Sequence, residues 1–247
     1  MSSAQHIPFH FHAEGHAFSG EFRHPGRHLI EALASTSLPT IGGHARAHVD
    51  HFYHQDFVSF RSAHTDVAGR RIDENTFKTH ATSIIEDLNI LDVVTADRIV
   101  VRLTSTHDPK NLEGHIVADG SEFHNLRIAG HLVKVTLRHN LLVRCVTFQD
   151  LRNQLEKGGE SGRITGKNER VVICSLVEKI ETDLPGVDPA RHVIKVPNFG
   201  KISLAEIFAE PGSRTLTMLR LELGSPHVAT LTAAEARTNG QPVPPGF

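Results

Sequence analysis

The chain is poor in several residue types that would each indicate a particular class of protein. Its 247 residues include no Trp, one Tyr, two Met and two Cys. Two cysteines cannot build the disulfide framework of a small secreted domain, and both lie inside apolar runs. We therefore expect Cys145 and Cys174 to be buried thiols. No stretch approaches the roughly 20 apolar residues that a membrane-spanning helix needs.

The chain also lacks an excess of charge of one sign. The formal net charge is -2, and no run of Lys or Arg would form a footprint for nucleic acid. Residues 1–18 carry four histidines where a signal peptide would need an apolar centre. The sequence thus predicts a cytoplasmic protein without nucleic acid or membrane as a partner.

Alternation of apolar and polar residues with a period of two dominates the chain. It occurs in six runs of strand length, at 9–18, 44–54, 97–106, 131–139, 170–180 and 215–223. Regular alternation of strands and helices is missing, which favours a sandwich or a flattened barrel over a parallel α/β sheet. We predict a single all-β domain over residues 1–247, mostly antiparallel and built as a sandwich or a flattened barrel. Residues 241–247 (QPVPPGF) would form an extended tail.

Helical signals are few and short. They lie at 28–34 (HLIEALA), at 150–157 (DLRNQLEK) and at 203–209, where Ser203 and Glu206 fit a capping box. One to three short helices are therefore expected. Loops are expected at 107–114, 158–168 and 184–190, which are rich in Gly, Pro, Asn and Asp.

Two segments resemble each other, at 86–103 and 123–137, and predict two similar hairpins. Together with 82–106, 120–130 (GSEFHNLRIAG), 196–206 (VPNFGKISLAE), 215–226 (TLTMLRLELGSP) and 236–240 (ARTNG), they carry a family resemblance. Over about residues 15–240 the chain resembles the β-rich domain of bacterial choice-of-anchor P surface proteins. The resemblance implies a β fold and supplies no catalytic residue. We expect neither a signal peptide nor an anchor in this chain, and its histidines depart from the family's pattern.

Histidine is the residue type in excess. The chain has 19 histidines, and 17 of them precede residue 140. Clustered imidazoles bind transition metals, respond to pH or transfer protons. A solvated sheet surface also tolerates alternating His, Arg and Asp without any function, and this reading stays open.

The sharpest pattern is His10-x-His12-x-Glu14-x-His16. On a strand these side chains share one face, while Phe9, Phe11 and the two alanines take the other. Imidazoles two residues apart lie about 7 Å from each other at the Cα level and can converge on one ion. Histidines with one carboxylate are the ligand set of catalytic zinc or non-haem iron.

A second pattern covers residues 43–56. It places His44, His48, Asp50 and His54 on one face and His51 with Tyr53 on the other, unless a bulge shifts the alternation. Paired with the first strand, His44, His48 or His54 would complete the metal site, and Asp50 would orient an imidazole. The predicted cofactor is a transition metal, either zinc, iron or copper.

Three functions remain open. The first is a histidine-ligated metal-binding protein, which includes the case of a metalloenzyme acting on a small molecule. The second is a non-enzymatic protein that binds a partner or further copies of itself. The third is a metal-free enzyme whose apolar pocket is lined by Phe and His, with His48 or His54 in acid/base catalysis. No Gly-x-Ser-x-Gly elbow, Walker loop or Gly-x-Gly-x-x-Gly motif supports another chemistry.

Overall fold

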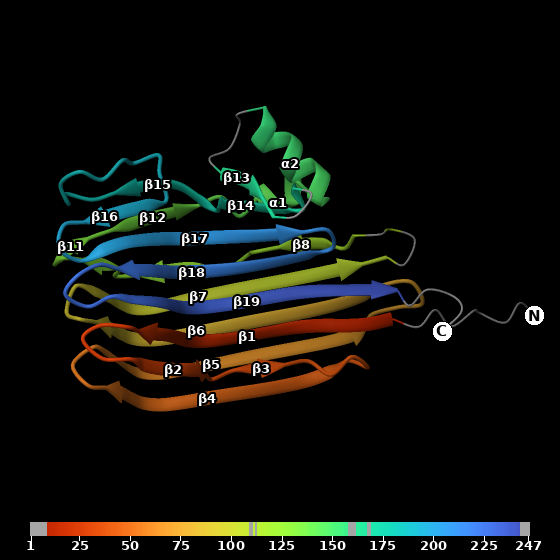
Figure 1. The fold of residues 1–247 in the computed structure, drawn as a ribbon. Coiled ribbons are helices and arrows are strands. Elements are labelled where there is room, and N and C mark those ends of the chain that lie inside the picture. Colours follow the sequence, from red (N-terminus) through yellow and green to blue (C-terminus); the bar gives the residue numbers. More distant parts are fainter. Residues whose placement is uncertain (1–8, 109–110, 112, 158–161, 167–168, 243–247) are drawn as a thin grey trace, which may run out of the picture.

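A computed structural model describes the chain except residues 1–8, 109–110, 112, 158–161, 167–168 and 243–247. It contains two large antiparallel sheets packed face to face (Figure 1). This is the sandwich that the period-two pattern predicts, and the sheets do not close into a barrel.

Sheet A has nine strands and sheet B has eight. The path through sheet A is β13-β14-β17-β18-β19-β1-β2, with β16 paired to β17 and β3 paired to β1. The path through sheet B is β11-β10-β7-β6-β5-β4, with β8 and β9 paired to β7. A small third sheet consists of β12 and β15.

The strands of sheet A are β1 (Phe9–Phe22), β2 (His28–Leu33), β3 (Thr36–Ser37), β13 (Gly162–Thr165), β14 (Val171–Ser175), β16 (Val193–Val196), β17 (Gly200–Glu210), β18 (Ser213–Leu223) and β19 (Ala229–Pro242). Those of sheet B are β4 (Gly43–His54), β5 (Val58–Arg71), β6 (Phe77–Ile90), β7 (Val94–His107), β8 (His115–Val117), β9 (Glu122–His124), β10 (Arg127–Ile128) and β11 (His131–Leu132). The third sheet joins β12 (Lys134–Leu137) to β15 (Val177–Glu181).

Two helices follow β12. They are α1 (Leu141–Arg144) and α2 (Phe148–Glu156), and α2 packs on β13 and β14. Thr147 and Asp150 form a capping box at the start of α2. The helix predicted at 150–157 is therefore present, and it begins earlier than predicted.

The other two predicted helices are wrong. Residues 28–33 form β2, which pairs with β1, and residues 203–209 lie inside β17. Short segments have little helical stability of their own, so pairing with a neighbouring strand overrides their helical pattern.

The remaining local predictions hold in part. The loop at 184–190 is confirmed. Residues 162–165 form β13 within the predicted loop 158–168, whereas several residues of that loop and of 107–114 lie outside the described ranges. Gln241 and Pro242 end β19, and residues 243–247 of the predicted tail are not described. The first repeat spans β6 and β7, and the second spans β9 to β12.

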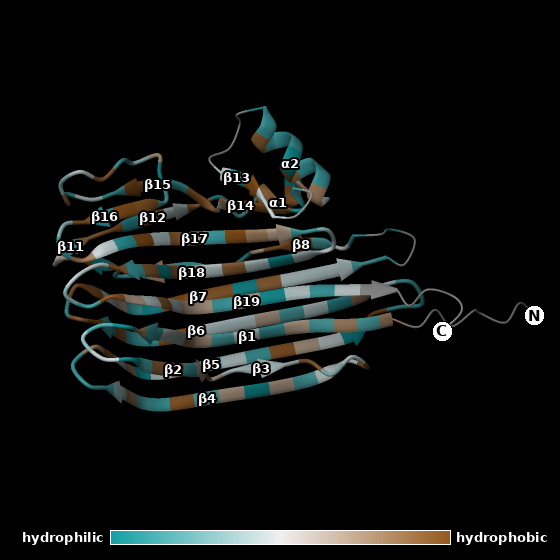
Figure 2. Cartoon of the chain, viewed as in Figure 1, coloured by the Kyte–Doolittle hydropathy of each residue, from teal (hydrophilic) through white to brown (hydrophobic). Residues whose placement is uncertain are grey.

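The core lies between the two sheets. Hydrophobic and hydrophilic residues alternate along much of the strands, as the colours in Figure 2 show, and buried hydrophobic residues from both sheets form the core. Phe9, Phe11, Phe18 and Phe22 of β1 are all buried there. Cys145 and Cys174 are buried as predicted, although Cys145 follows α1 instead of lying in a strand. None of the helices in the described ranges has the length and apolar character needed to cross a membrane.

Candidate functional site

Strand β1 inverts the alternation of its side chains halfway along. Ala17 and Phe18 are consecutive, and both are fully buried. The pairing with β19 passes from His16 opposite Glu235 to Phe18 opposite Ala233. A regular strand sends neighbouring side chains to opposite faces, so two inward residues in a row mark a local irregularity.

The same inversion crosses β19, β18 and β17. Ala234 of β19 has a φ of 53° and Ala205 of β17 has a φ of 47°. Both are fully buried next to a second buried residue, Ala233 and Leu204 respectively. Met218 and Leu219 form the matching buried pair of β18. On each strand, the outward residues on either side of the pair are three positions apart and approach each other on the outer face of sheet A.

These outward residues are polar on all four strands. They form two rows, which we call the polar rows: Glu206, Thr217, Glu235 and His16 in one, and Ser203, Arg220, Thr232 and Ser19 in the other.

Hydrogen bonds join the two rows on β1 and β19. The hydroxyl of Ser19 lies 2.9 Å from Nε2 of His16 and 2.7 Å from the hydroxyl of Thr232. Nδ1 of His16 is 3.8 Å from Oε1 of Glu235. Thr217 of β18 donates a hydrogen bond of 2.7 Å to the other oxygen of Glu235. The imidazole and the carboxylate are therefore held in fixed positions from several strands.

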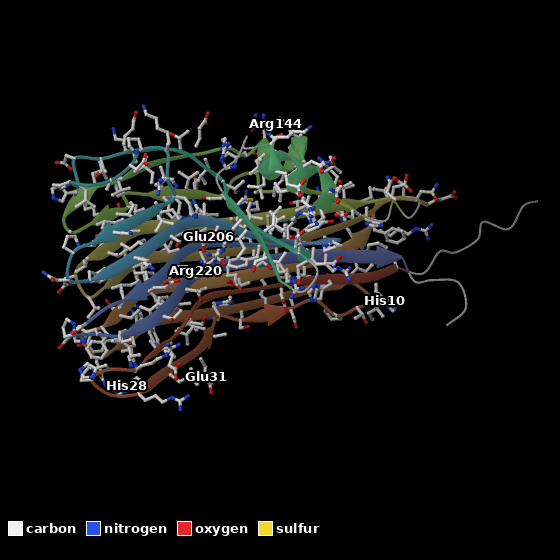
Figure 3. The ribbon with its side chains drawn as sticks, turned by 45° about the horizontal axis from the view of Figure 1, so that its top comes forward. His10, His28, Glu31, Arg144, Glu206 and Arg220 are labelled. Atoms are coloured by element: carbon white, nitrogen blue, oxygen red, sulfur yellow. The ribbon has the colours of Figure 1, made fainter. Side chains whose placement is uncertain are left out.

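An ion pair occupies the other end of the polar rows. Arg220 of β18 contacts the carboxylate of Glu206 of β17 (Figure 3). His192 lies 3.3 Å from the same carboxylate. Glu206 is only 4% exposed. Burial alone would raise the pKa of Glu206, but the hydrogen bond with His192 and the charge of Arg220 outweigh it. The pKa therefore lies below its ordinary value, and Glu206 is a carboxylate at neutral pH.

A pocket of about 420 Å³ opens next to His16. It is lined by Glu14, Gly15, His16, Ser35, Thr36, Ser37, Glu235 and Arg237. Arg237 lies 3.5 Å from Glu14 and 3.4 Å from Glu210. Two carboxylates, one guanidinium, one imidazole and several hydroxyls thus meet in a volume that suits a small ligand.

The structure keeps the first predicted ligand set on one face but spreads it along β1. His10 and His12 project from the outer face of sheet A, and Nε2 of His12 is 3.9 Å from Glu14. Glu14 pairs instead with Arg237, and His16 belongs to the polar rows. His10 lies near one end of the sheet, away from Arg220 at its middle (Figure 3).

The second predicted set belongs to the opposite face of the sandwich. His44, His48 and Asp50 are exposed on the outer face of sheet B, where the carboxylate of Asp66 lies 2.8 Å from His44. Asp50 lies 3.9 Å from His48 but is itself exposed. These residues do not approach those of β1, because β1 and β4 turn their outward faces in opposite directions.

His54 does not share a face with His44 and His48, which corrects the prediction. His51 has a φ of 52°, and the alternation of β4 inverts there. His54 consequently points toward the end of the core, with its ring centroid 5.6 Å from that of His28 and 6.3 Å from that of Phe22. The sequence pattern allowed for a bulge in this strand, and the irregularity at His51 turns His54 to the other face.

Across the described ranges, no three His, Cys, Asp or Glu side chains form a group that could hold a metal ion. The metal site therefore stays a prediction. The third hypothesis predicts an apolar catalytic pocket around His48 or His54. His48 is exposed and does not lie in such a pocket, whereas His54 lies among phenylalanines.

The polar rows were missed although the sequence carries a signal for them. Each of the four strands contains a polar residue, two apolar residues and a second polar residue: HAFS at 16–19, SLAE at 203–206, TMLR at 217–220 and TAAE at 232–235. This spacing also fits one turn of helix, which is why 203–206 was interpreted as a capping box.

No curated protein and no solved structure matches the chain. One protein family does, over residues 9–163 and 152–210, and its description is a domain of unknown function, DUF8256. These matches cover most of both sheets. Nothing in them tests the resemblance to choice-of-anchor P domains, which stays a prediction. The chain belongs to the DUF8256 family.

Proposed function

We propose that the protein binds a small ligand carrying several amino or hydroxyl groups in the pocket beside His16 and Glu235. The observation that carries the proposal is the convergence of Glu14, Glu235, Arg237 and His16 around one hollow. The partner would thus be a small molecule, and the protein a binding protein rather than a nucleic-acid or membrane protein.

The balance of charges favours a ligand that donates hydrogen bonds. Arg237 lies between the carboxylates of Glu14 and Glu210, so its charge is already matched within the protein. Glu235 is left with a hydroxyl and an imidazole as its neighbours. Carboxylates accept hydrogen bonds and donate none, so the pocket has acceptors to offer to ammonium or hydroxyl groups.

The side chains are also pre-organised for binding. Thr217 holds Glu235, while Ser19 and Thr232 hold His16. A ligand that meets groups already fixed by their neighbours avoids much of the entropic cost of ordering them. The proposal places this binding in the cytoplasm, which the low cysteine content favours.

Isothermal titration calorimetry with glucosamine, glucose, spermidine and inorganic phosphate tests the proposal. We expect an amine or a polyol to bind and phosphate not to bind. Glu235→Gln should weaken binding about tenfold or more, because a hydrogen bond to a charged group is lost. Glu222→Gln on β18, an exposed residue of the same sheet, is the matched control and should bind normally. Binding of phosphate alone, or of no probe, would overturn the proposal.

A further inference from the structure

Strand β4 is an edge of the sandwich. It pairs with β5 on one side, and it ends the path of sheet B on the other. Figure 1 shows it at the lower border of the molecule, next to β2 and β3 of sheet A. Such an edge presents a row of backbone N–H and C=O groups to any strand that can align with it.

Three exposed apolar side chains lie on or beside the strands of this border. Ile41, in the turn before β4, is 90% exposed, Leu29 of β2 is 67% exposed and Tyr53 of β4 is 65% exposed. Ile41 and Tyr53 lie at opposite ends of β4, about 40 Å apart along the strand, so these side chains do not form one patch. Association through β4 is therefore supported by the edge itself and by the charges of its side chains.

The outward residues of β4 have a self-complementary order. Arg46 and Asp50 lie symmetrically on either side of His48. In an antiparallel pair of identical strands centred on His48, Arg46 of each copy lies opposite Asp50 of the other. We propose that two copies of the chain associate through their β4 edges, with His48 opposite His48 on the two-fold axis.

The charges needed for these pairs are available. The side chains of Arg46 and Asp50 are 74% and 60% exposed. Arg46 already contacts Asp66, but a guanidinium has five N–H donors and can serve a second carboxylate. Within the described part of the chain, the ion-pair neighbour of Asp50 is His48 at 3.9 Å, so Asp50 lacks a permanently charged partner.

Other registers fit less well. Residues directly opposite each other in an antiparallel pair must face the same side, so the centre falls on a residue. A centre at Arg46 would place two guanidiniums together. A centre at Ala47 would place Arg46 opposite His48 and Asp50 opposite His44. Each charged residue would then face a histidine instead of a residue with a full opposite charge. The inversion at His51 ends the regular stretch beyond Asp50.

Charge reversal tests this register. The mass in solution, measured by analytical ultracentrifugation across a range of concentrations, should rise from 27.2 kDa toward twice that value. Asp50→Arg and Arg46→Asp should each weaken association about tenfold or more, because attraction becomes repulsion in both pairs. The double variant restores the order of charges and should associate as the natural chain does. Glu222→Arg, on the outer face of sheet A, is the control.

Cross-linking tests the position of the axis independently. Opposed residues of an antiparallel pair are close enough for a disulfide, and both natural cysteines are buried. His48→Cys should form a covalent dimer on oxidation, whereas His44→Cys should not, since its two copies would lie about 27 Å apart along the strands. A chain that stays monomeric, or a dimer indifferent to both single charge reversals, overturns the proposal. So does cross-linking at residue 44 instead of 48. Each of these results leaves the ligand pocket on sheet A untouched.

Discussion

The hydroxyl of Ser19 lies 2.9 Å from Nε2 of His16, although the two residues are three positions apart on one strand. In a regular strand they would face opposite sides of the sheet. They meet because Ala17 and Phe18 both point into the core. The same irregularity in three further strands turns scattered polar residues into one connected surface. The candidate site is thus a product of backbone inversion and not of any single motif.

Strand β4 of sheet B also inverts the alternation of its side chains, but there two consecutive residues point outward instead of inward. Asp50 and His51 are both exposed, and His51 has a φ of 52°. A left-handed conformation costs a residue with a Cβ about 1–2 kcal/mol, and glycine adopts it freely. His51→Gly should therefore raise the free energy of unfolding by about 0.5–1 kcal/mol.

Lys78→Gly provides the comparison. Lys78 is exposed near the start of β6 in the same sheet and has ordinary strand backbone. Glycine there should lower the free energy of unfolding by about 0.5–1 kcal/mol, measured by urea denaturation. Equal losses in the two variants would contradict the left-handed assignment of His51.

Glu206 and Arg220 should contribute strongly to stability. Glu206→Gln leaves a largely buried guanidinium without its carboxylate, and we expect a loss of about 3 kcal/mol. Lys201 and Glu222 pair across the same two strands at 3.8 Å, but both are more than half exposed. Glu222→Gln should therefore cost less than about 1 kcal/mol in the same denaturation experiment. Similar losses would show that burial does not distinguish the two pairs. The carboxylate of Glu206 has a lowered pKa, so its contribution is fully present above the ordinary pKa of glutamate and is lost as the pH falls from there through the lowered pKa of the folded state.

Much of the fold was predictable from alternation alone. Runs such as 9–18 and 215–223 lie within β1 and β18, because one face of each strand must be apolar to cover the core. Residues 28–34 and 203–209 were not predictable in this way. Their three- and four-residue spacings match a helix, and only pairing with strands distant in sequence decides the outcome.

The candidate site was less accessible to sequence reasoning. The prediction found His16 and Glu14 but joined them to β4, because alternation says which residues share a face and not which strands share a sheet. Glu206, Arg220 and Glu235 come from the last third of the chain. Their proximity to His16 depends on β1 lying beside β19, a pairing between the two ends of the described chain.

A metal ion bound as the sequence predicts would take its ligands from one face of the sandwich. His10 and His12 lie on sheet A, whereas His44 and His48 lie on sheet B. Zinc bound by β1 should be lost in His12→Ala and retained in His48→Ala. Metal analysis of protein purified without an affinity tag measures this. Equal loss in both variants would require the two faces to share an ion, contrary to the fold.

His107 gives the fold a specific sensitivity to acid. It is fully buried, and its ring centroid lies 5.1 Å from that of Phe9. Burial penalises the charged ring and lowers the pKa of His107, even though a backbone hydrogen bond with Asn111 and the charge of Asp108 act in the opposite direction. In the unfolded chain the imidazole has its ordinary pKa of about 6.5. Below about pH 6.5 the unfolded state therefore binds a proton that the folded state does not.

The free energy of unfolding should consequently fall with decreasing pH, by up to about 1.4 kcal/mol per pH unit from this group. His107→Phe keeps an aromatic ring beside Phe9 and removes the titration, so its stability should depend less on pH between about 6.5 and 5. His10→Gln removes an exposed histidine of β1, away from the β4 edge, and should leave that dependence unchanged. Urea denaturation at a series of pH values measures all three proteins. An unchanged slope in His107→Phe would mean that His107 is protonated equally easily in the folded and unfolded chains, which its burial forbids.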